Sequence, residues 1–221
     1  MQNAGGISLG ETVGFPQFIH THRHLVPNTG IILSLGFVTF EEAGILYLVA
    51  IKVPAPYKEQ LQTLQASLRP AEWRITMEPH ITLLAPGRPL CDPEEAVTQF
   101  RILRLAIPPF TITSSRTTMF ERRHHSTVIL EVHPKPALKL LVSKLVAAST
   151  WQVTSATTKR PHIPHITLVN QVPVQRRTQT IQDLKSVKIS IHFECTSITL
   201  FAKESRWPHW TELAQLPLTK E

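Results

Sequence analysis

The chain has 221 residues, of which 42% are hydrophobic, and this is enough for a single domain with a real core. A net charge of +7 favours anionic partners such as RNA ends or nucleotides. Two cysteines exclude a disulfide framework and fit reduced thiols in a cytoplasmic protein. Neither a transmembrane segment nor a secretory signal is expected, because Glu41 and Glu42 interrupt the apolar stretch 30–51 and the start lacks a charged, then apolar, pattern.

Residues 1–44 are the least informative part of the chain. They contain His-Thr-His-Arg-His at positions 20–24, which suggests a metal site or a histidine-triad nucleotide hydrolase. The triad family has apolar residues between its histidines, however, where this chain has Thr21 and Arg23. We therefore expect a poorly ordered basic extension over 1–44, without a metal site, followed by one domain over 45–221.

The first half of that domain begins with a strand and a helix. The β-branched and apolar run 45–53 predicts a buried central strand. Leucines at helical spacing predict a helix over 57–68. The segment 73–84 is expected to be the next strand with its lead-in, and the proline- and glycine-rich 85–89 is expected to be a loop.

The middle of the chain predicts a helix and a strand pair. Asp92 is placed to cap a helix over about 93–105. Strands are expected over 110–114 and 126–132, and the segment 115–125 is expected to join them.

The last part repeats the same kinds of element. Helices are expected over 136–149 and 174–187, and strands over 188–193, 197–202 and 210–216. This order of strands and helices predicts an α+β fold of two pseudo-symmetric lobes, with antiparallel sheets facing a central cleft and helices outside.

A five-residue repeat gives the strongest indication of function. Pro79-His80-Ile81-Thr82-Leu83 recurs letter for letter as Pro164-His165-Ile166-Thr167-Leu168. Polar and apolar residues alternate in each copy, as in a half-buried strand. The pattern therefore predicts His80 and Thr82 on one sheet face and His165 and Thr167 on the same face of a second strand.

Two imidazoles and two hydroxyls form a set that suits phosphodiester chemistry. A neutral imidazole accepts a proton from water, and a protonated one gives a proton to a leaving oxygen. The threonine hydroxyls can donate hydrogen bonds to non-bridging phosphate oxygens. A single copy would be read as an ordinary strand with a satisfied histidine, but two identical copies favour catalysis without a metal or cofactor.

The two motifs resemble those of the two-histidine (2H) phosphoesterase superfamily, in particular its LigT-like, 2′-5′ RNA ligase branch. The closing segments, 198–201 and 210–218, resemble the final β-hairpin of that family, so the resemblance extends from about Ile45 to Leu218. Many members have an arginine directly after the second motif, where this chain has Val169 and Asn170. The motif therefore does not identify the cation that anchors the substrate.

The resemblance also suggests residues that bind the substrate. In this family a strand pair borders the cleft and often carries an aromatic residue that stacks on the base. Phe120 is our candidate for stacking, and Arg122 or Arg123 for contact with phosphate or ribose; a solvated basic turn is the alternative. Arg88 can also reach a phosphate, or it is simply a solvated loop cation.

The resulting hypothesis is a metal-independent cytoplasmic phosphodiesterase, expected to act as a monomer. We expect it to hydrolyse a 2′,3′-cyclic phosphate at an RNA end to a 2′-phosphate. Substrates that need no further catalytic group are 2′-5′ oligoadenylate, cyclic dinucleotides and ADP-ribose 1″,2″-cyclic phosphate. Two alternatives remain: a non-catalytic module that binds RNA or nucleotides, and a structural domain in which His80 and His165 lie far apart.

Overall fold

A computed structural model of the chain describes residues 44–68, 77–150, 152–153, 163–185, 189–204 and 209–220. The histidines at 20–24 and nearly all of the expected extension 1–44 lie outside the described residues, as does the lead-in 73–76 to the first motif. Within these residues the chain forms nine strands and four α-helices.

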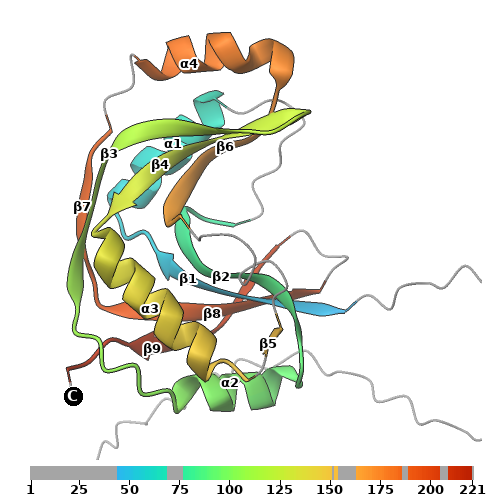
Figure 1. Cartoon of the computed structure of the whole chain (residues 1–221), viewed down its shortest axis with the longest axis vertical. Coiled ribbons are helices and arrows are strands. Elements are labelled where there is room, and N and C mark those ends of the chain that lie inside the picture. The colour runs from blue at the N-terminus through green and yellow to red at the C-terminus, as the bar shows by residue number, and fades with distance from the viewer. Residues whose placement is uncertain are drawn as a thin grey trace, which may run out of the picture. The chain divides into compact units, whose positions relative to one another are not determined.

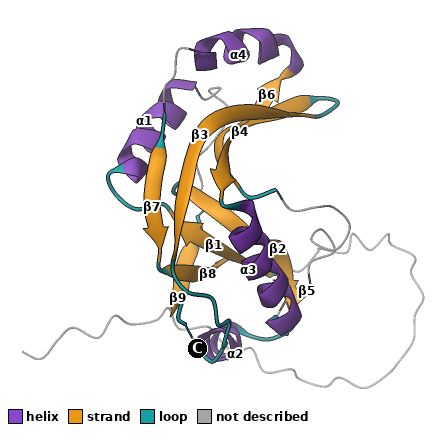
Figure 2. Ribbon diagram, turned by 60° about the vertical axis from the view of Figure 1, so that its left-hand side comes forward, coloured by secondary structure: helices purple, strands orange, loops and turns teal. Residues whose placement is uncertain are grey.

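Nine strands form one antiparallel sheet. Their spatial order is β7-β3-β4-β6-β2-β1-β8-β9, and β5 pairs with β2 off this path. The strands are β1 (Ile45–Lys52), β2 (His80–Pro89), β3 (Phe110–Glu121), β4 (His125–His133), β5 (Gln152–Val153), β6 (His165–Pro173), β7 (Ile191–Cys195), β8 (Ser197–Glu204) and β9 (Thr211–Pro217). The sheet is strongly curved (Figures 1 and 2), and β2 and β6 join its two halves.

Four α-helices complete the α+β fold, which confirms the predicted class. They are α1 (Tyr57–Leu68), α2 (Pro93–Arg101), α3 (Lys135–Ala148) and α4 (Arg177–Lys185), and a 3-10 turn, Val174–Arg176, precedes the last. The predicted cap of α2 is present, because the backbone N–H of Glu95 donates to Asp92 Oδ1 over 2.8 Å. None of the helices described here is long and apolar enough to cross a membrane.

Two helices reach across to the opposite half of the sheet. Helix α1 follows β1 in the chain but packs on β6, whereas α3 follows β4 but packs on β2. Leu61 of α1 and Leu138, Leu141 and Leu145 of α3 are fully buried in this contact layer. Because these leucines recur at helical spacing, they lie on one face of each helix. Their burial joins the two halves of the sheet through one core.

The main core lies on the helix-covered face of the sheet. Ile81 and Leu83 of β2, with Ile166 and Leu168 of β6, are fully buried in it. This confirms the predicted alternation in both motifs. A smaller separate cluster is formed by Leu48, Ala50 and Phe201, with Met77 and Trp210 packed against it.

Two predicted loops are parts of strands. Residues 85–89 continue β2 past a bulge, where Gly87 pairs with Tyr47, and then pair with β5. The loop prediction was wrong because the bulge accommodates Pro86, and Pro89 lies at the end of the strand, where it pairs with Gln152 of β5. The first seven residues of 115–125 belong to β3, which leaves only 122–124 as the turn.

The predicted helix ends were less accurate than the helix positions. Helix α2 ends at Arg101, before Leu105 and Ile107, which are buried on either side of Ala106 with φ of 47°. Helix α3 buries Leu138, Leu141 and Leu145, whereas the next residue, Val146, is 43% exposed.

Candidate active site

The two motifs meet at the centre of the sheet. Ile81 of β2 pairs directly with Ile166 of β6 in antiparallel register. In such a pair, His80 lies on the side of Thr167, and Thr82 lies on the side of His165. All four polar side chains are half-buried on the sheet face opposite the main core. The arrangement contradicts the alternative in which the repeat is accidental and the histidines lie far apart.

The two imidazoles are oriented in the same way. His80 Nδ1 lies 2.7 Å from the backbone oxygen of Glu78, and His165 Nδ1 lies 2.7 Å from that of Ile163. Because a carbonyl oxygen only accepts, each Nδ1 carries a proton and donates it. This hydrogen bond sets the tautomer and makes Nε2 of each ring the atom that can exchange a proton at the site.

The protonation of His80 is linked to that of His165. Burial lowers the pKa of His80, the hydrogen bond to Glu78 opposes this, and positive charge on His165 lowers the pKa further. Double protonation of the pair is therefore disfavoured. When only one of the two imidazoles is positively charged, the charged ring can act as an acid and the neutral ring as a base.

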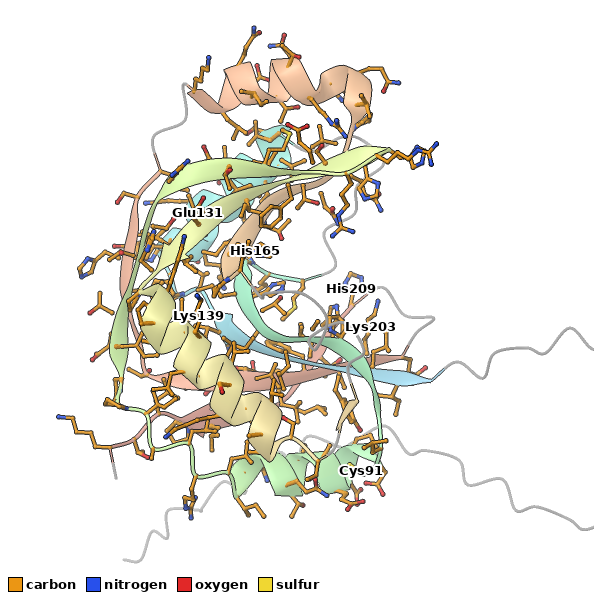
Figure 3. The ribbon with its side chains drawn as sticks, in the orientation of Figure 1. Cys91, Glu131, Lys139, His165, Lys203 and His209 are labelled. Carbon is orange, nitrogen blue, oxygen red and sulfur yellow. The ribbon has the colours of Figure 1, made fainter. Side chains whose placement is uncertain are left out.

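The neighbouring strands place opposite charges beside the two histidines. Lys52 of β1 lies directly across from His80, and its Nζ is 2.8 Å from Glu212 Oε2. Glu131 of β4 lies directly across from His165, as Figure 3 shows. The Glu131 side chain is 17% exposed and forms ion pairs with Lys135 at 3.3 Å and Arg116 at 4.0 Å.

Phe120 lies at the second histidine. Its ring centre is 5.3 Å from that of His165, and the two rings meet edge to face at 89°. The structure thus brings the candidate for base stacking into contact with the quartet.

The other substrate-binding candidates lie further out. Arg122 and Arg123 have exposed side chains in the turn between β3 and β4. Arg177 of α4 holds this turn, because its Nη2 donates to the backbone oxygen of Arg122 and its Nη1 lies 3.7 Å from Glu121 Oε2. Arg88 contributes its backbone to β2, but its side chain is outside what the structure describes.

The position after the second motif has a structural contact. Asn170 Oδ1 accepts from Thr127 Oγ1 and from the backbone N–H of Gln171, both over 2.9 Å. Gln171 has φ of 57°, at a bulge where β4 and β6 change register. Asn170 therefore supports the backbone at this bulge.

Sequence reasoning missed several residues around the quartet. Gln65 of α1 is buried and donates from Nε2 to the backbone oxygen of Thr167 over 2.8 Å. On the first half of the sheet, a cavity of about 400 Å³ opens beside His80, and Lys52 and Trp210 are among its lining residues. A polar residue among the leucines of α1 was the available signal for Gln65, whereas nothing local in the sequence marks the cavity.

Comparison with known proteins assigns the chain to a family. A model of the 2′-5′ RNA ligase superfamily matches residues 53–207, and the chain belongs to this superfamily. Its membership, together with the fold, is consistent with a 2H phosphoesterase of the LigT type. No curated protein sequence matches the chain.

Solved structures show the same fold. E. coli LigT in its apo form has a TM-score of 0.53 at 23% identity, covering 79% of this chain and 97% of LigT. E. coli LigT complexed with 3′-AMP has a TM-score of 0.52 at 23% identity, with 79% and 98% covered. A structure described as a phosphoesterase has a TM-score of 0.51 at 21% identity, with 79% and 99% covered.

Proposed function

We propose that the protein is a metal-independent phosphodiesterase that opens a 2′,3′-cyclic phosphate at an RNA end to a 2′-phosphate. The observation that carries this proposal is the direct pairing of Ile81 with Ile166, which brings the two His/Thr pairs to adjacent strands on one sheet face. Superfamily membership supports the broader class, a phosphoesterase.

One imidazole acts as base and the other as acid. The neutral ring takes a proton from water at Nε2 while the water oxygen bonds to phosphorus. The P–O3′ bond breaks, and the protonated ring gives its proton to O3′. Water is thereby added across one ester bond, so no metal or redox partner is required for balance.

Thr82 and Thr167 hold the phosphate during this step. Their hydroxyls donate to the non-bridging oxygens, where negative charge increases in the transition state. Arg122 and Arg123 are proposed to contact more distant phosphates of an RNA substrate, because they are exposed in the turn next to the Phe120 end of β3. The assignment of Arg88 to phosphate binding also remains a proposal.

A substrate panel tests this function. Nucleoside 2′,3′-cyclic phosphates, a cyclic-phosphate-ended RNA, 2′-5′ oligoadenylate and cyclic dinucleotides would be incubated with EDTA-treated protein. We expect turnover of the cyclic phosphates that is lost in both His80→Ala and His165→Ala. Activity restored only by added metal would contradict the mechanism, and binding without any turnover would favour a non-catalytic RNA- or nucleotide-binding module.

A further inference from the structure

The cavity beside His80 is built from parts of the chain that are far apart in sequence. Its apolar wall is formed by Met77, Phe201 and Trp210, and its charged rim is formed by Lys52, Glu78 and Glu212, with His209 also lining the cavity. Its volume of about 400 Å³ is within the range of small-molecule sites. Because His80 also lines it, a ligand in this cavity lies beside one histidine of the quartet.

The apolar wall packs on a small buried cluster. Trp210 and Met77 pack on the buried side chains of Leu48, Ala50 and Phe201, a cluster separate from the main core. The side chain of Trp210 is only half-buried, and the same residue lines the cavity. An indole that is half-buried at a cavity wall is suited to bind a flat aromatic group by stacking.

The charged rim complements this aromatic wall. Lys52 lies across from His80 on the adjacent strand and forms an ion pair with Glu212 at 2.8 Å. Lys203 Nζ lies 5.3 Å from the centre of the Trp210 ring, and Figure 3 places Lys203 near His209. A ligand with an aromatic group at one end and an anion at the other, such as a nucleotide, matches both features.

We propose that this cavity is the nucleoside subsite of the enzyme, with the base stacked on Trp210, the ribose beside His80 and the cyclic phosphate between the two motif strands, where the positive charge of Lys52 across from His80 attracts it. This inference rests on the proposed function and deepens it. It also revises the role of Phe120, which contacts the His165 ring and therefore acts as a positioning residue for this imidazole.

Two substrates separate base binding from the chemistry. One is a nucleoside 2′,3′-cyclic phosphate, and the other is 1-O-methylribose 2′,3′-cyclic phosphate, which lacks a base. We expect Trp210→Ala to lower the ratio of kcat/KM for the first substrate to that for the second by about 5- to 150-fold. Trp210→Phe should retain most of the preference, because a ring remains. An unchanged ratio in Trp210→Ala would overturn the assignment.

Phe120→Ala and Lys52→Gln are the matched controls. Loss of Phe120 should reduce kcat for both substrates by a similar factor, because His165 serves both. Loss of Lys52 should raise KM for both, because both carry the phosphate. If Phe120→Ala instead removes the preference for the base-bearing substrate, the base stacks at Phe120, and the proposed subsite is wrong.

A binding measurement keeps this inference distinct from the proposed function. Uridine and adenosine 2′-monophosphates would be titrated calorimetrically into His165→Ala and into His165→Ala combined with Trp210→Ala. We expect the second protein to bind about 5- to 150-fold more weakly, whether or not the wild type turns over any cyclic phosphate. Equal affinity, with unchanged thermal unfolding, would reject the subsite even for an active enzyme.

Discussion

Strands β2 and β6 carry the same five-residue motif in different surroundings. Each strand presents a histidine tied to a carbonyl two residues earlier, and each histidine has a charged residue directly across the ladder. Beside His80 this residue is Lys52, next to an open cavity; beside His165 it is Glu131, with Phe120 against the ring. The repeated motif supplies the same reactive groups twice, whereas the different neighbours make the two ends of the site chemically distinct.

The largest expected effect comes from either histidine. His80→Ala and His165→Ala should each lower kcat by about 10²- to 10⁴-fold, because each removes one proton-transfer step. The double variant should be little worse than the worse single one, since the pair acts as a unit. His192→Ala, an exposed histidine on β7, is the control, and its steady-state kinetics should match the wild type. Full activity in either single variant would remove that histidine from the mechanism.

Removal of a threonine hydroxyl should cost somewhat less. Thr82→Val and Thr167→Val each remove one donor to the phosphate, and we expect kcat to fall by about 10²- to 10³-fold. Similar losses in both variants would support equal roles for the two halves. Thr111→Val, at an exposed position of β3, controls for the change of residue type. If the two threonine variants raise only KM, their hydroxyls bind ground state and transition state equally.

The hydrogen bond from Gln65 to the second motif strand, β6, is expected to contribute to the stability of the protein. Gln65→Leu leaves the backbone oxygen of Thr167 without its donor from α1 and should lower the free energy of unfolding by about 1–3 kcal/mol. Urea denaturation followed by circular dichroism measures this. The exposed Gln60→Leu on the same helix should change stability by less than about 0.5 kcal/mol. An equal effect of the two substitutions would contradict a specific role of this hydrogen bond.

The pH profile tests the linkage between the histidines. Burial and the charge of His165 lower the pKa of His80. Both histidines are therefore protonated together only at a pH below about 6.5, the ordinary pKa of histidine. The acidic limb of kcat/KM should therefore lie below pH 6.5, with activity rising as pH increases through it. In His165→Gln, NMR titration should show a higher pKa for His80, because one cause of the lowering is gone. An acidic limb above pH 6.5 would contradict this linkage.

Local patterns predicted the elements that carry the site. Helical leucine spacing placed α1 at its observed bounds, and polar–apolar alternation oriented both motifs correctly. These features depend on neighbours within a few residues, so a sequence can reveal them. The strand extensions at 85–89 and 115–121 were missed, because they form through pairing with distant strands across bulges.

The surroundings of the quartet could not be predicted for the same reason. Lys52, Phe201 and Trp210 become neighbours only when β1, β8 and β9 assemble next to β2. Nothing within a few residues of any of them indicates that they share a cavity. The contact between Phe120 and His165 likewise depends on the order of β3, β4 and β6 in the sheet.

The single residue pair between β2 and β6 has a mechanical consequence. Among the described residues, Ile81 and Ile166 form the only ladder contact between these two strands, whereas β1–β2 and β4–β6 are paired over much of their length. The spacing of the two imidazoles therefore depends on how the two halves of the sheet pack together. Helices α1 and α3, each packed on a strand of the opposite half, connect these halves. The geometry of the quartet thus rests on side-chain packing in the core more than on backbone hydrogen bonds between the two motif strands.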